Sequence, residues 1–239
     1  MEKAAVLMAG GFGTRLRPLT DSIPKPLLPI AGRPTLEWAL ELLRQYGFSK
    51  AVITLGYRAD QIKQHFGSRY HDIELVYTLE KEPLGTGGPL HLAKPHLNGT
   101  FFMLFTDNLY DIDLDDMLKF HKKERVIGTT ALKEFDDPSP FGVAVMDGNR
   151  IAHFVEKPKK EEAPSKLVDT GLYVFEPEFL THVPQTFNIL GKDVFPRLAA
   201  SKMVAGYPFK GQWFPTDTME RYAVANAFWK NPIAPKQGL

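Results

Sequence analysis

The sequence predicts an α/β protein with a mostly parallel central sheet and helices on both faces. Three observations support this prediction. Short apolar runs alternate with amphipathic segments through the first half of the 239-residue chain. A cluster of three glycines, at positions 10, 11 and 13, follows the first apolar run directly. The composition, 44% hydrophobic and 12% aromatic, supplies enough apolar material for the core of one large domain.

Strands and helices alternate up to residue 105. The predicted buried strands are 4–9, 51–55, 73–78 and 101–105. The predicted helices are about 34–46, 58–66 and 85–97. For the first helix, Pro34 suits an initial position and Gly47 suits the residue after the end. Leu36, Leu40 and Leu43 recur at helical spacing, so we expect that stripe to belong to the core.

The second half of the chain is less regular. It contains predicted strands at 127–132, 142–147, 150–156 and 167–176, joined by short connections, and predicted helices at 191–201 and 218–229. No linker, internal repeat or low-complexity tract interrupts it, and no hexapeptide repeat follows residue 220. We therefore expect one domain over residues 1–239.

Charge and cysteine content exclude several classes of partner. Lys+Arg is 29 and Asp+Glu is 28, a net charge of +1, which does not favour a nucleic-acid or anionic-membrane surface. Cysteine is absent, so disulfides and thiolate metal sites are excluded, in keeping with a reducing compartment. No segment approaches the ~20 apolar residues of a membrane span. We expect a soluble cytoplasmic protein with no nucleic-acid or membrane partner.

The segment "LMAGGFGTRLRPLTDSIPKPL" at 7–27 carries the first functional signal. A glycine-rich turn after a buried strand lets backbone N–H groups approach phosphate oxygens. The dinucleotide-binding fingerprint needs a glycine where Leu16 stands, and no Gly-Lys-Ser/Thr of a P-loop follows. The loop therefore indicates a third kind of phosphate site, with Thr14 and Arg15 adding a hydroxyl and a guanidinium. The alternative is a tight turn beside a surface arginine.

Lys25 lies between Pro24 and Pro26. The two rings restrict the backbone and bias it toward an extended form. A lysine held in this way loses less entropy when it binds an anion. A solvated lysine in a proline-rich loop is the alternative, which the preceding glycine loop makes weaker.

These motifs, in this order, resemble the sugar-1-phosphate nucleotidyltransferases, or NDP-sugar pyrophosphorylases. Further matches are "EPLGTGGPL" at 82–90, "FG" at 141–142, "FVEKP" at 154–158 and "VDTGLYVF" at 168–175. The resemblance extends from Lys3 to about Trp229. It implies a Rossmann-like nucleotidyltransferase fold that uses Mg²⁺, an NTP and a sugar 1-phosphate. The NTP part would be about 1–110 and the sugar-phosphate part about 111–239. Homo-oligomers are common in the family, and the sequence leaves the assembly open.

The resemblance also implies site residues. Arg15 and Lys25 would be catalytic. The implied nucleotide-binding residues are Leu7, Ala9, Gly10, Gly11, Gly13, Thr14, Arg15, Pro83, Gly85, Thr86 and Gly87. The implied sugar-phosphate-binding residues are Gly142, Glu156, Lys157, Asp169, Thr170 and Gly171. The family usually has Asn where Asp169 stands, and a surface ion pair is the alternative role of Glu156 and Lys157.

Two aspartates are the implied metal ligands. Asp107 follows an apolar strand directly, where open α/β sheets bind ligands, although a turn or helix cap is the plain alternative. Most relatives carry Trp-x-Asp-x-Gly-Thr near the end, whereas this chain has "WFPTDT" at 213–218. That variant resembles the corresponding segment of glucose-1-phosphate cytidylyltransferases. Pro215 stands where the usual aspartate would fall, and the resemblance implies that Asp217 is the metal ligand instead. A helix N-cap is the rival role of Asp217.

The motifs disagree about the base. "EPLGTGGPL" resembles mannose- and heptose-1-phosphate guanylyltransferases, and it lacks the glutamine with which many uridylyl and thymidylyl enzymes read a pyrimidine. "WFPTDT" favours a cytidylyltransferase. We expect GTP with mannose or heptose 1-phosphate. The alternative is CTP, UTP or dTTP with glucose 1-phosphate or another sugar phosphate.

Two other functional classes stay open. A glycosyltransferase could use the Asp-x-Asp pattern within "DIDLDD" at 111–116. A regulator could bind a nucleotide without catalysis. Neither alternative accounts for the glycine loop together with all of the charged residues that follow it.

Overall fold

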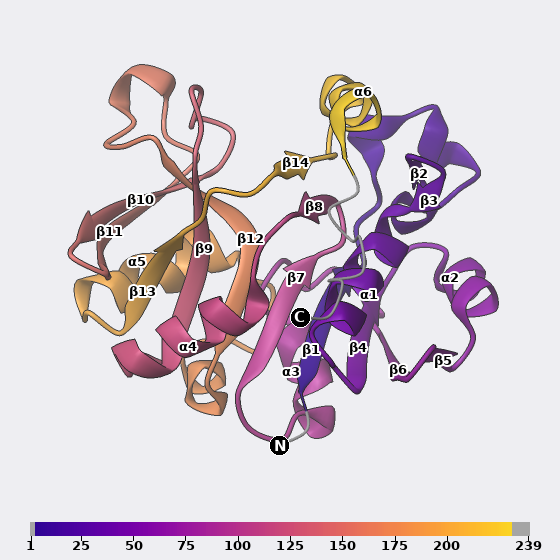
Figure 1. Ribbon diagram of the computed structural model, residues 1–239, viewed down its shortest axis with the longest axis horizontal. Coiled ribbons are helices and arrows are strands. Elements are labelled where there is room, and N and C mark those ends of the chain that lie inside the picture. Colours follow the sequence, from indigo (N-terminus) through magenta and orange to yellow (C-terminus); the bar gives the residue numbers. More distant parts are fainter. Residues whose placement is uncertain (1–2, 231–239) are drawn as a thin grey trace, which may run out of the picture.

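The computed structural model describes residues 3–230, which form one continuous sheet with helices packed against it. The ten strands of the sheet lie in the order β10-β11-β13-β9-β12-β7-β1-β4-β6-β5 (Figure 1). Two further two-stranded pairings, β14–β8 and β2–β3, lie outside it. The α/β class predicted from the sequence is confirmed.

The elements agree in type with the predicted ones. The α-helices are α1 Thr35–Gln45, α2 Ala59–Phe66, α3 Pro89–Ala93, α4 Leu114–Glu124, α5 Phe195–Ala200 and α6 Met219–Phe228. The strands of the large sheet are β1 Ala4–Ala9, β4 Lys50–Leu55, β5 Arg69–Tyr70, β6 Ile73–Leu79, β7 Phe101–Phe105, β9 Gly128–Glu134, β10 Gly142–Asp147, β11 Arg150–Glu156, β12 Leu167–Phe175 and β13 Val204–Pro208. The remaining strands are β2 Pro29–Ile30, β3 Arg33–Pro34, β8 Asn108–Tyr110 and β14 Trp213–Pro215.

The first half of the sheet is parallel, as predicted. β1 pairs in parallel with β4 on one side and with β7 on the other, and β4 pairs in parallel with β6. Every residue of β1 is buried, which explains its unbroken apolar sequence. Because these strands run in the same direction, their carboxyl ends lie at the same edge of the sheet.

The second half is largely antiparallel, so the prediction of a mostly parallel sheet holds only up to β7. β12 runs antiparallel to both β7 and β9. β10 and β11 form an antiparallel hairpin across the two residues 148–149, with Gly148 at φ 58°. A parallel pair needs a crossover of about a dozen residues, which these short connections do not supply.

Helices cover both faces of the sheet, as expected. α1, α2 and α4 pack into one buried apolar cluster, which contains Leu36, Leu40 and Leu43 of the predicted stripe. α3 and α5 pack into a second cluster on the other face. Among residues 3–230, no helix has the length and apolar character needed to cross a membrane.

Some features differ from the predicted ones. Helix α4 and the short strands β2, β3, β5, β8, β13 and β14 have no counterpart among the predicted elements. Pro34 is the N-cap of α1 rather than its first residue. The helix predicted at 191–201 begins with a π-helical turn, Leu190–Val194, before α5.

A buried histidine joins α4 to the sheet. The side chain of His121 is 0% exposed, and its Nδ1 lies 2.8 Å from the hydroxyl of Thr129 on β9. Its Nε2 lies 3.2 Å from a carboxylate oxygen of Glu176, which also accepts a hydrogen bond from Lys122 at 2.6 Å. Burial lowers the pKa of His121, and Glu176 offsets that effect only in part.

This histidine makes stability depend on pH. An unfolded histidine has a pKa of about 6.5, so below that pH the unfolded chain binds a proton that folded His121 resists. The free energy of unfolding should therefore decrease as pH falls from 7 to 5, by at most about 1.4 kcal/mol per pH unit from this residue. Urea denaturation at several pH values should show a smaller slope for His121→Gln. The exposed His153→Gln is the control and should keep the parent slope. Equal slopes in the parent and His121→Gln would contradict this role.

Candidate functional site

A cavity of about 640 Å³ lies at the carboxyl edge of the parallel strands. Residues that follow β1, β4, β6 and β7 line it, among them Gly10, Gly56, Glu80 and Asp107. We call it the larger cavity. A smaller cavity of about 190 Å³ adjoins it, and Thr86, Phe105, Asp107 and Asp217 line both. Two compartments thus meet at two aspartates.

The glycine loop forms one wall of the larger cavity. Gly13 has φ 67°, in the left-handed region, and a Cβ there would lie 2.8 Å from the side chain of Thr20. Thr20 also donates a hydrogen bond to the carbonyl of Gly13 at 2.8 Å. A short 3₁₀ turn, Thr14–Leu16, follows and leaves Arg15 largely exposed toward the cavity. Glycine at 13 is therefore required by both backbone conformation and space.

Lys25 reaches into the same cavity. Pro24 has an extended backbone, as predicted, but Lys25 itself starts a 3₁₀ turn, Lys25–Leu27, because Leu28 N–H bonds back to its carbonyl. Its Nζ lies 2.5 Å from Oδ2 of Asp107, and the lysine side chain is only 13% exposed. The lysine is thus a paired, mostly buried cation rather than a solvated one.

Asp107 is tied to the C-terminal segment through its backbone. Its carbonyl accepts hydrogen bonds from the N–H and the hydroxyl of Thr216, at 2.8 and 2.9 Å. β8 and β14 pair antiparallel beside this contact, with Asn108 opposite Pro215. Asp217 follows directly, so the segment that carries it is held against the end of β7.

Asp217 is not a helix cap. The N-cap of α6 is Thr218, whose hydroxyl accepts the N–H of Arg221 at 3.3 Å. Asp217 instead forms ion pairs with Arg15 and Arg221, each at 2.8 Å. Burial raises the pKa of Asp217, but the hydrogen bond and charge of Arg221, followed by the charges of Arg15 and Lys25, outweigh it and hold the pKa below its ordinary value. Asp217 is therefore ionised at neutral pH.

The smaller cavity contains the other predicted residues. Gly142, Glu156, Lys157, Asp169, Thr170 and Gly171 all line it.

Two carboxyl groups of the smaller cavity have raised pKa values. Asp169 accepts hydrogen bonds from Tyr173, Thr130 and the N–H of Gly171, at 2.6, 2.8 and 3.0 Å. Burial raises the pKa of Asp169 despite those bonds. Burial and then the charge of Asp169 raise the pKa of Glu156. The structure thus gives Asp169 an internal role, holding β12 to β9, in addition to its place on the cavity wall.

Lys157 lies at the rim of this cavity. Its side chain is 61% exposed, and its Nζ lies 3.8 Å from a carboxylate oxygen of Glu156. The backbone adopts a left-handed φ of 47°, and its N–H donates to the carbonyl of Phe141 at 3.0 Å. The ion pair is loose, and the ammonium is free to meet an anion that enters the cavity.

Two predicted nucleotide-binding residues line neither cavity. Leu7 is 0% exposed inside β1. Gly87 packs against Asn188, whose side-chain oxygen would lie 1.9 Å from a Cβ at that position. Gly85 and Gly87 of "EPLGTGGPL" were both predicted to bind the nucleotide. In the structure, Gly85 and Gly87 make room for the backbone and side chain of Asn188. The other predicted nucleotide-binding residues line the larger cavity.

Sequence reasoning missed several lining residues. Phe12 and Phe187 are 55% and 62% exposed at the larger cavity. Glu80 also lines it. Arg221 lines neither cavity, but it forms an ion pair with Asp217, and its guanidinium lies 4.5 Å from the centre of the Phe141 ring. Glu80 carries the same signal that identified Asp107, a carboxyl group directly after a parallel strand. Arg221 carries no such signal, because its role depends on α6 docking.

Asp107 and Asp217 are the residues that could hold a metal. Within residues 3–230, no group of three or more His, Cys, Asp or Glu side chains has the arrangement of a metal site. Mg²⁺ commonly uses only one or two protein carboxylates, together with substrate phosphates and water. Two carboxylates on the shared wall of two cavities fit that pattern. Both contact cationic nitrogens here, so the site already accommodates positive charge next to them.

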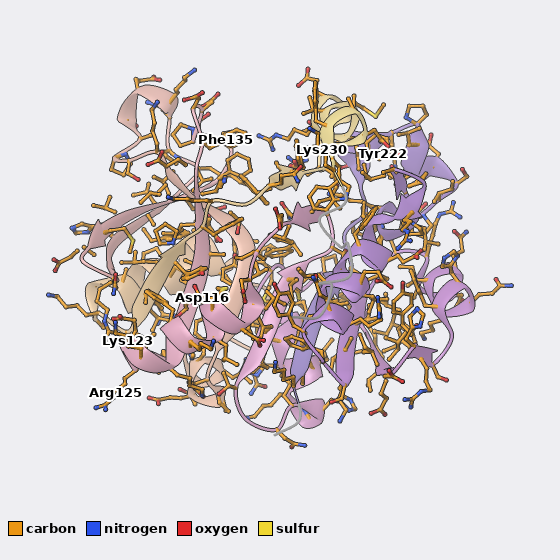
Figure 2. The ribbon with its side chains drawn as sticks, viewed as in Figure 1. Asp116, Lys123, Arg125, Phe135, Tyr222 and Lys230 are labelled. Atoms are coloured by element: carbon orange, nitrogen blue, oxygen red, sulfur yellow. The ribbon has the colours of Figure 1, made fainter. Side chains whose placement is uncertain are left out.

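The acidic run at 111–116 lies elsewhere. Asp113 is the N-cap of α4, Asp115 pairs with Lys3 at 2.7 Å, and Asp116 contacts the hydroxyl of Tyr207. Figure 2 shows Asp116, which belongs to α4, well apart from Tyr222, which belongs to α6. The Asp-x-Asp pattern is therefore a helix start, and it does not face either cavity.

Known proteins resemble the chain over nearly its whole length. The family model described as nucleotidyl transferase matches residues 4–231. The chain is 38% identical over 224 residues to a UTP–glucose-1-phosphate uridylyltransferase of Synechocystis sp., a match that covers 86% of this chain and 56% of that protein. It is 31% identical over 240 residues to a mannose-1-phosphate guanyltransferase of Saccharomyces cerevisiae, covering 97% and 66%. The chain thus spans between about half and two thirds of the length of these relatives.

Solved structures share the fold. A UDP-glucose pyrophosphorylase in complex with UDP-glucose superposes with a TM-score of 0.82 at 24% identity, covering 95% of this chain and 98% of that one. A UTP-bound UGPase from Acinetobacter baumannii gives a TM-score of 0.82 at 21% identity, covering 95% and 93%. Because the family model extends over nearly all of the described residues, the chain belongs to the nucleotidyl transferase family.

Proposed function

We propose that this protein transfers a nucleotidyl group from an NTP to a sugar 1-phosphate, giving an NDP-sugar and pyrophosphate. The observation that carries the proposal is the meeting of two cavities at Asp107 and Asp217. A reaction between two phosphate-bearing substrates needs two such compartments that share a cationic and metal-binding wall. The curated relatives include uridylyl- and guanylyltransferases that act on sugar 1-phosphates, which supports this class.

The larger cavity would hold the NTP and the smaller one the sugar phosphate. This matches the proposed division of a single domain into an NTP part at about 1–110 and a sugar-phosphate part at about 111–239. The loop amides at 10–14 and Arg15 would bind the β- and γ-phosphates. Lys157 would bind the phosphate group of the sugar phosphate. Glu156 would accept hydrogen bonds from the hydroxyl groups of the sugar. Lys25, beside Asp107, would contact the α-phosphate and the incoming phosphate.

The chemistry needs no general base. The second pKa of a phosphate monoester is ~6, so the sugar phosphate is already anionic at neutral pH. One of its oxygens attacks the α-phosphorus in line, the bond to the bridging oxygen breaks, and pyrophosphate leaves. The protein must hold the two anions in line and stabilise charge on the leaving group. Arg15 and Lys25 supply that charge.

Asp107 and Asp217 would hold Mg²⁺, which neutralises charge on the phosphates when it is bound. Binding requires a rearrangement of the ion pairs that these carboxylates form with Lys25, Arg15 and Arg221. A triphosphate that draws Arg15 and Lys25 toward its own oxygens would free them. Arg221, on α6, would continue to orient Asp217.

The proposed nucleotide is GTP, with mannose or heptose 1-phosphate. Mannose-1-phosphate guanylyltransferases from several organisms match at 31–34% identity, which supports GTP. The uridylyltransferase match, at 38%, supports the alternative of a pyrimidine nucleotide with glucose 1-phosphate. Cytoplasmic location and homo-oligomeric assembly stay predictions.

Two classes of alternative function lose support. An NDP-sugar-dependent glycosyltransferase would be expected to use an Asp-x-Asp pair at its site, and here Asp113 caps a helix. A regulator that binds a nucleotide without catalysis would need only one cavity, whereas here two cavities meet at the charged junction.

Loss of either cation should slow turnover. Arg15→Ala and Lys25→Ala should each reduce kcat by about 10²–10³-fold at saturating substrates, because each removes a group that stabilises charge. Pyrophosphate release measures this, with thermal unfolding as the check on folding. Arg17→Ala is the matched control, since Arg17 is 66% exposed and pairs only weakly with Asp21 at 3.4 Å. Near-normal turnover in both variants would refute the mechanism.

The metal assignment predicts a changed Mg²⁺ requirement. Asp107→Asn and Asp217→Asn should each raise the Mg²⁺ concentration that gives half-maximal activity, because each removes a hard anionic ligand. EDTA should abolish the parent activity. Asp115→Asn, a surface aspartate of the α4 start, should titrate like the parent. An unchanged Mg²⁺ dependence of Asp217→Asn would show that Asp217 does not bind the metal. Its role would then be limited to the ion pairs with Arg15 and Arg221.

Nucleotide and sugar preferences can be measured together. GTP, CTP, UTP, dTTP and ATP would each be assayed with mannose and glucose 1-phosphates for pyrophosphate release. We expect the largest kcat/KM for GTP with mannose 1-phosphate, because a site built for one base edge leaves polar groups unpaired with another. A CTP or UTP rate well above the GTP rate would replace the guanylyl assignment and leave the nucleotidyltransferase assignment intact.

A further inference from the structure

Asp217 divides its two carboxylate oxygens between two arginines in different surroundings. Oδ1 accepts a hydrogen bond from Arg221 at 2.8 Å, and Oδ2 forms an ion pair with Arg15 at 2.8 Å. The side chain of Arg15 is 64% exposed and lines the larger cavity, where the triphosphate of the proposed function would draw it away. The side chain of Arg221 is 21% exposed and lines neither cavity. A ligand in the larger cavity can therefore free Oδ2 while Oδ1 stays on Arg221.

Arg221 is itself held in place at both ends. Its backbone N–H donates to the hydroxyl of Thr218, the N-cap of α6, at 3.3 Å. Its guanidinium lies 4.5 Å from the centre of the Phe141 ring, a distance at which an aromatic face attracts a cation. Phe141 contacts two further rings, those of Phe135 and Trp213, at centroid distances of 5.3 and 5.1 Å. The guanidinium therefore has a fixed direction, and little side-chain entropy is lost when it orients a carboxylate.

Asp107 divides its oxygens in the same way. Oδ2 pairs with Lys25 at 2.5 Å, and Oδ1 accepts a hydrogen bond from the side-chain amide of Asn108 at 2.8 Å. The amide oxygen of Asn108 accepts in turn the indole N–H of Trp213 at 3.0 Å. Each aspartate thus has one oxygen on a cation that lines the larger cavity and one on a group that an aromatic side chain holds. When phosphates draw Arg15 and Lys25 away, Oδ2 of each aspartate becomes available.

The direction of a carboxylate oxygen matters to Mg²⁺ as much as its charge, because this ion demands near-ideal octahedral geometry. Groups that hydrogen-bond to the ligands of a metal fix that direction, and their loss typically costs about 10–100-fold in metal affinity or activity. Lysine carries the same charge as arginine but lacks the planar guanidinium that stacks on a ring and donates along fixed directions. Substitution of Arg221 can therefore separate the orientation of Asp217 from the compensation of its charge.

We propose that Arg221 is a positioning residue for the metal: stacked on Phe141, it holds Oδ1 of Asp217 and so directs Oδ2 toward Mg²⁺. The inference rests on the proposed function, because it takes Asp217 as a ligand of the Mg²⁺ that accompanies a triphosphate. Arg221 lines neither cavity, so it acts through Asp217 rather than on a substrate. A plain i,i+4 ion pair on a helix would need only the charge of Arg221, and the experiment measures this difference.

Binding of inorganic tripolyphosphate tests this role without a base, a sugar or turnover. Its dissociation constant would be measured by calorimetry with excess Mg²⁺ and again with EDTA, and the ratio of the two constants is the contribution of the metal. The proteins would be the parent, Arg221→Lys, Arg221→Met and Phe141→Leu. Arg44→Lys is the matched control, since Arg44 also pairs with a mostly buried carboxylate, that of Glu41 at 2.9 Å, and lines neither cavity.

The parent and Arg44→Lys should bind tripolyphosphate more tightly with Mg²⁺ than with EDTA, by the same ratio. Arg221→Lys and Arg221→Met should each lower that ratio by about 10-fold, the lower end of the effect of losing a group that orients a metal ligand. Phe141→Leu keeps every charge and should lower the ratio by a smaller factor, so the test does not depend on the folding of the Arg221 variants. In turnover assays, Arg221→Lys should lower kcat and raise the Mg²⁺ requirement with an unchanged KM for the sugar phosphate.

Other results would overturn the positioning role. A ratio retained in Arg221→Lys but lost in Arg221→Met would show that charge alone suffices. A raised KM for the sugar phosphate with an unchanged ratio would place Arg221 on the substrate instead. Equal binding by the parent with Mg²⁺ and with EDTA would refute both the role of Arg221 and the metal site. A ratio that depends on Arg221, without pyrophosphate release from any NTP, would sustain the positioning role and refute nucleotidyl transfer.

Discussion

The carbonyl oxygen of Asp107 accepts two hydrogen bonds from Thr216, and the functional site depends on this contact. It joins the end of β7 to a segment more than a hundred residues later in the chain. The β8–β14 pairing and the bond from the Trp213 indole to Asn108 at 3.0 Å reinforce it. Through this junction Asp217 and Arg221 come to the edge of a parallel sheet to which neither belongs. Without it, the wall that the two cavities share would lose Asp217.

Charge compensation explains how so many ionised groups coexist at this junction. Two carboxylates face three cationic side chains, and each carboxylate is paired with at least one cation. Removing one partner of a partly buried pair is costly, because the other charge stays desolvated and unpaired. A ligand that carries both phosphate and a metal ion can replace these pairs without leaving charge unbalanced. The same set of side chains can thus be stable before binding and complementary to polyanions during it.

The sequence predicts the local parts of this arrangement well and the long-range parts poorly. β1, the glycine loop and the stripe of α1 follow from burial periodicity and glycine geometry, which are properties of neighbouring residues. The resemblance to the nucleotidyl transferase family, drawn from the same loop, is confirmed by the family match. The antiparallel half was not predicted, because strand direction depends on how β12 pairs across the sheet.

The differences at the site have the same origin. Gly87 lines neither cavity and packs against Asn188, a partner that is distant in sequence and therefore not visible in the local pattern. The N-cap of α6 was offered at Asp217 instead of Thr218, since capping preferences alone do not distinguish adjacent acceptors. The capping geometry does, and it leaves the Asp217 carboxylate free to pair with two arginines.

The two ends of the larger cavity carry different groups, which in the proposed function would separate the reaction from the choice of base. Cations and carboxylates at the junction act on phosphates, which every nucleotide carries, so they cannot distinguish one base from another. The other end is lined by Gly56, Tyr57, Glu80, Lys81 and Glu82, among others, and its donors and acceptors differ from those of the junction. Relatives named for UTP and for GTP match this chain at 38% and at 31–34% identity. In the proposed function, overall identity would therefore measure the shared phosphate chemistry rather than the choice of nucleotide.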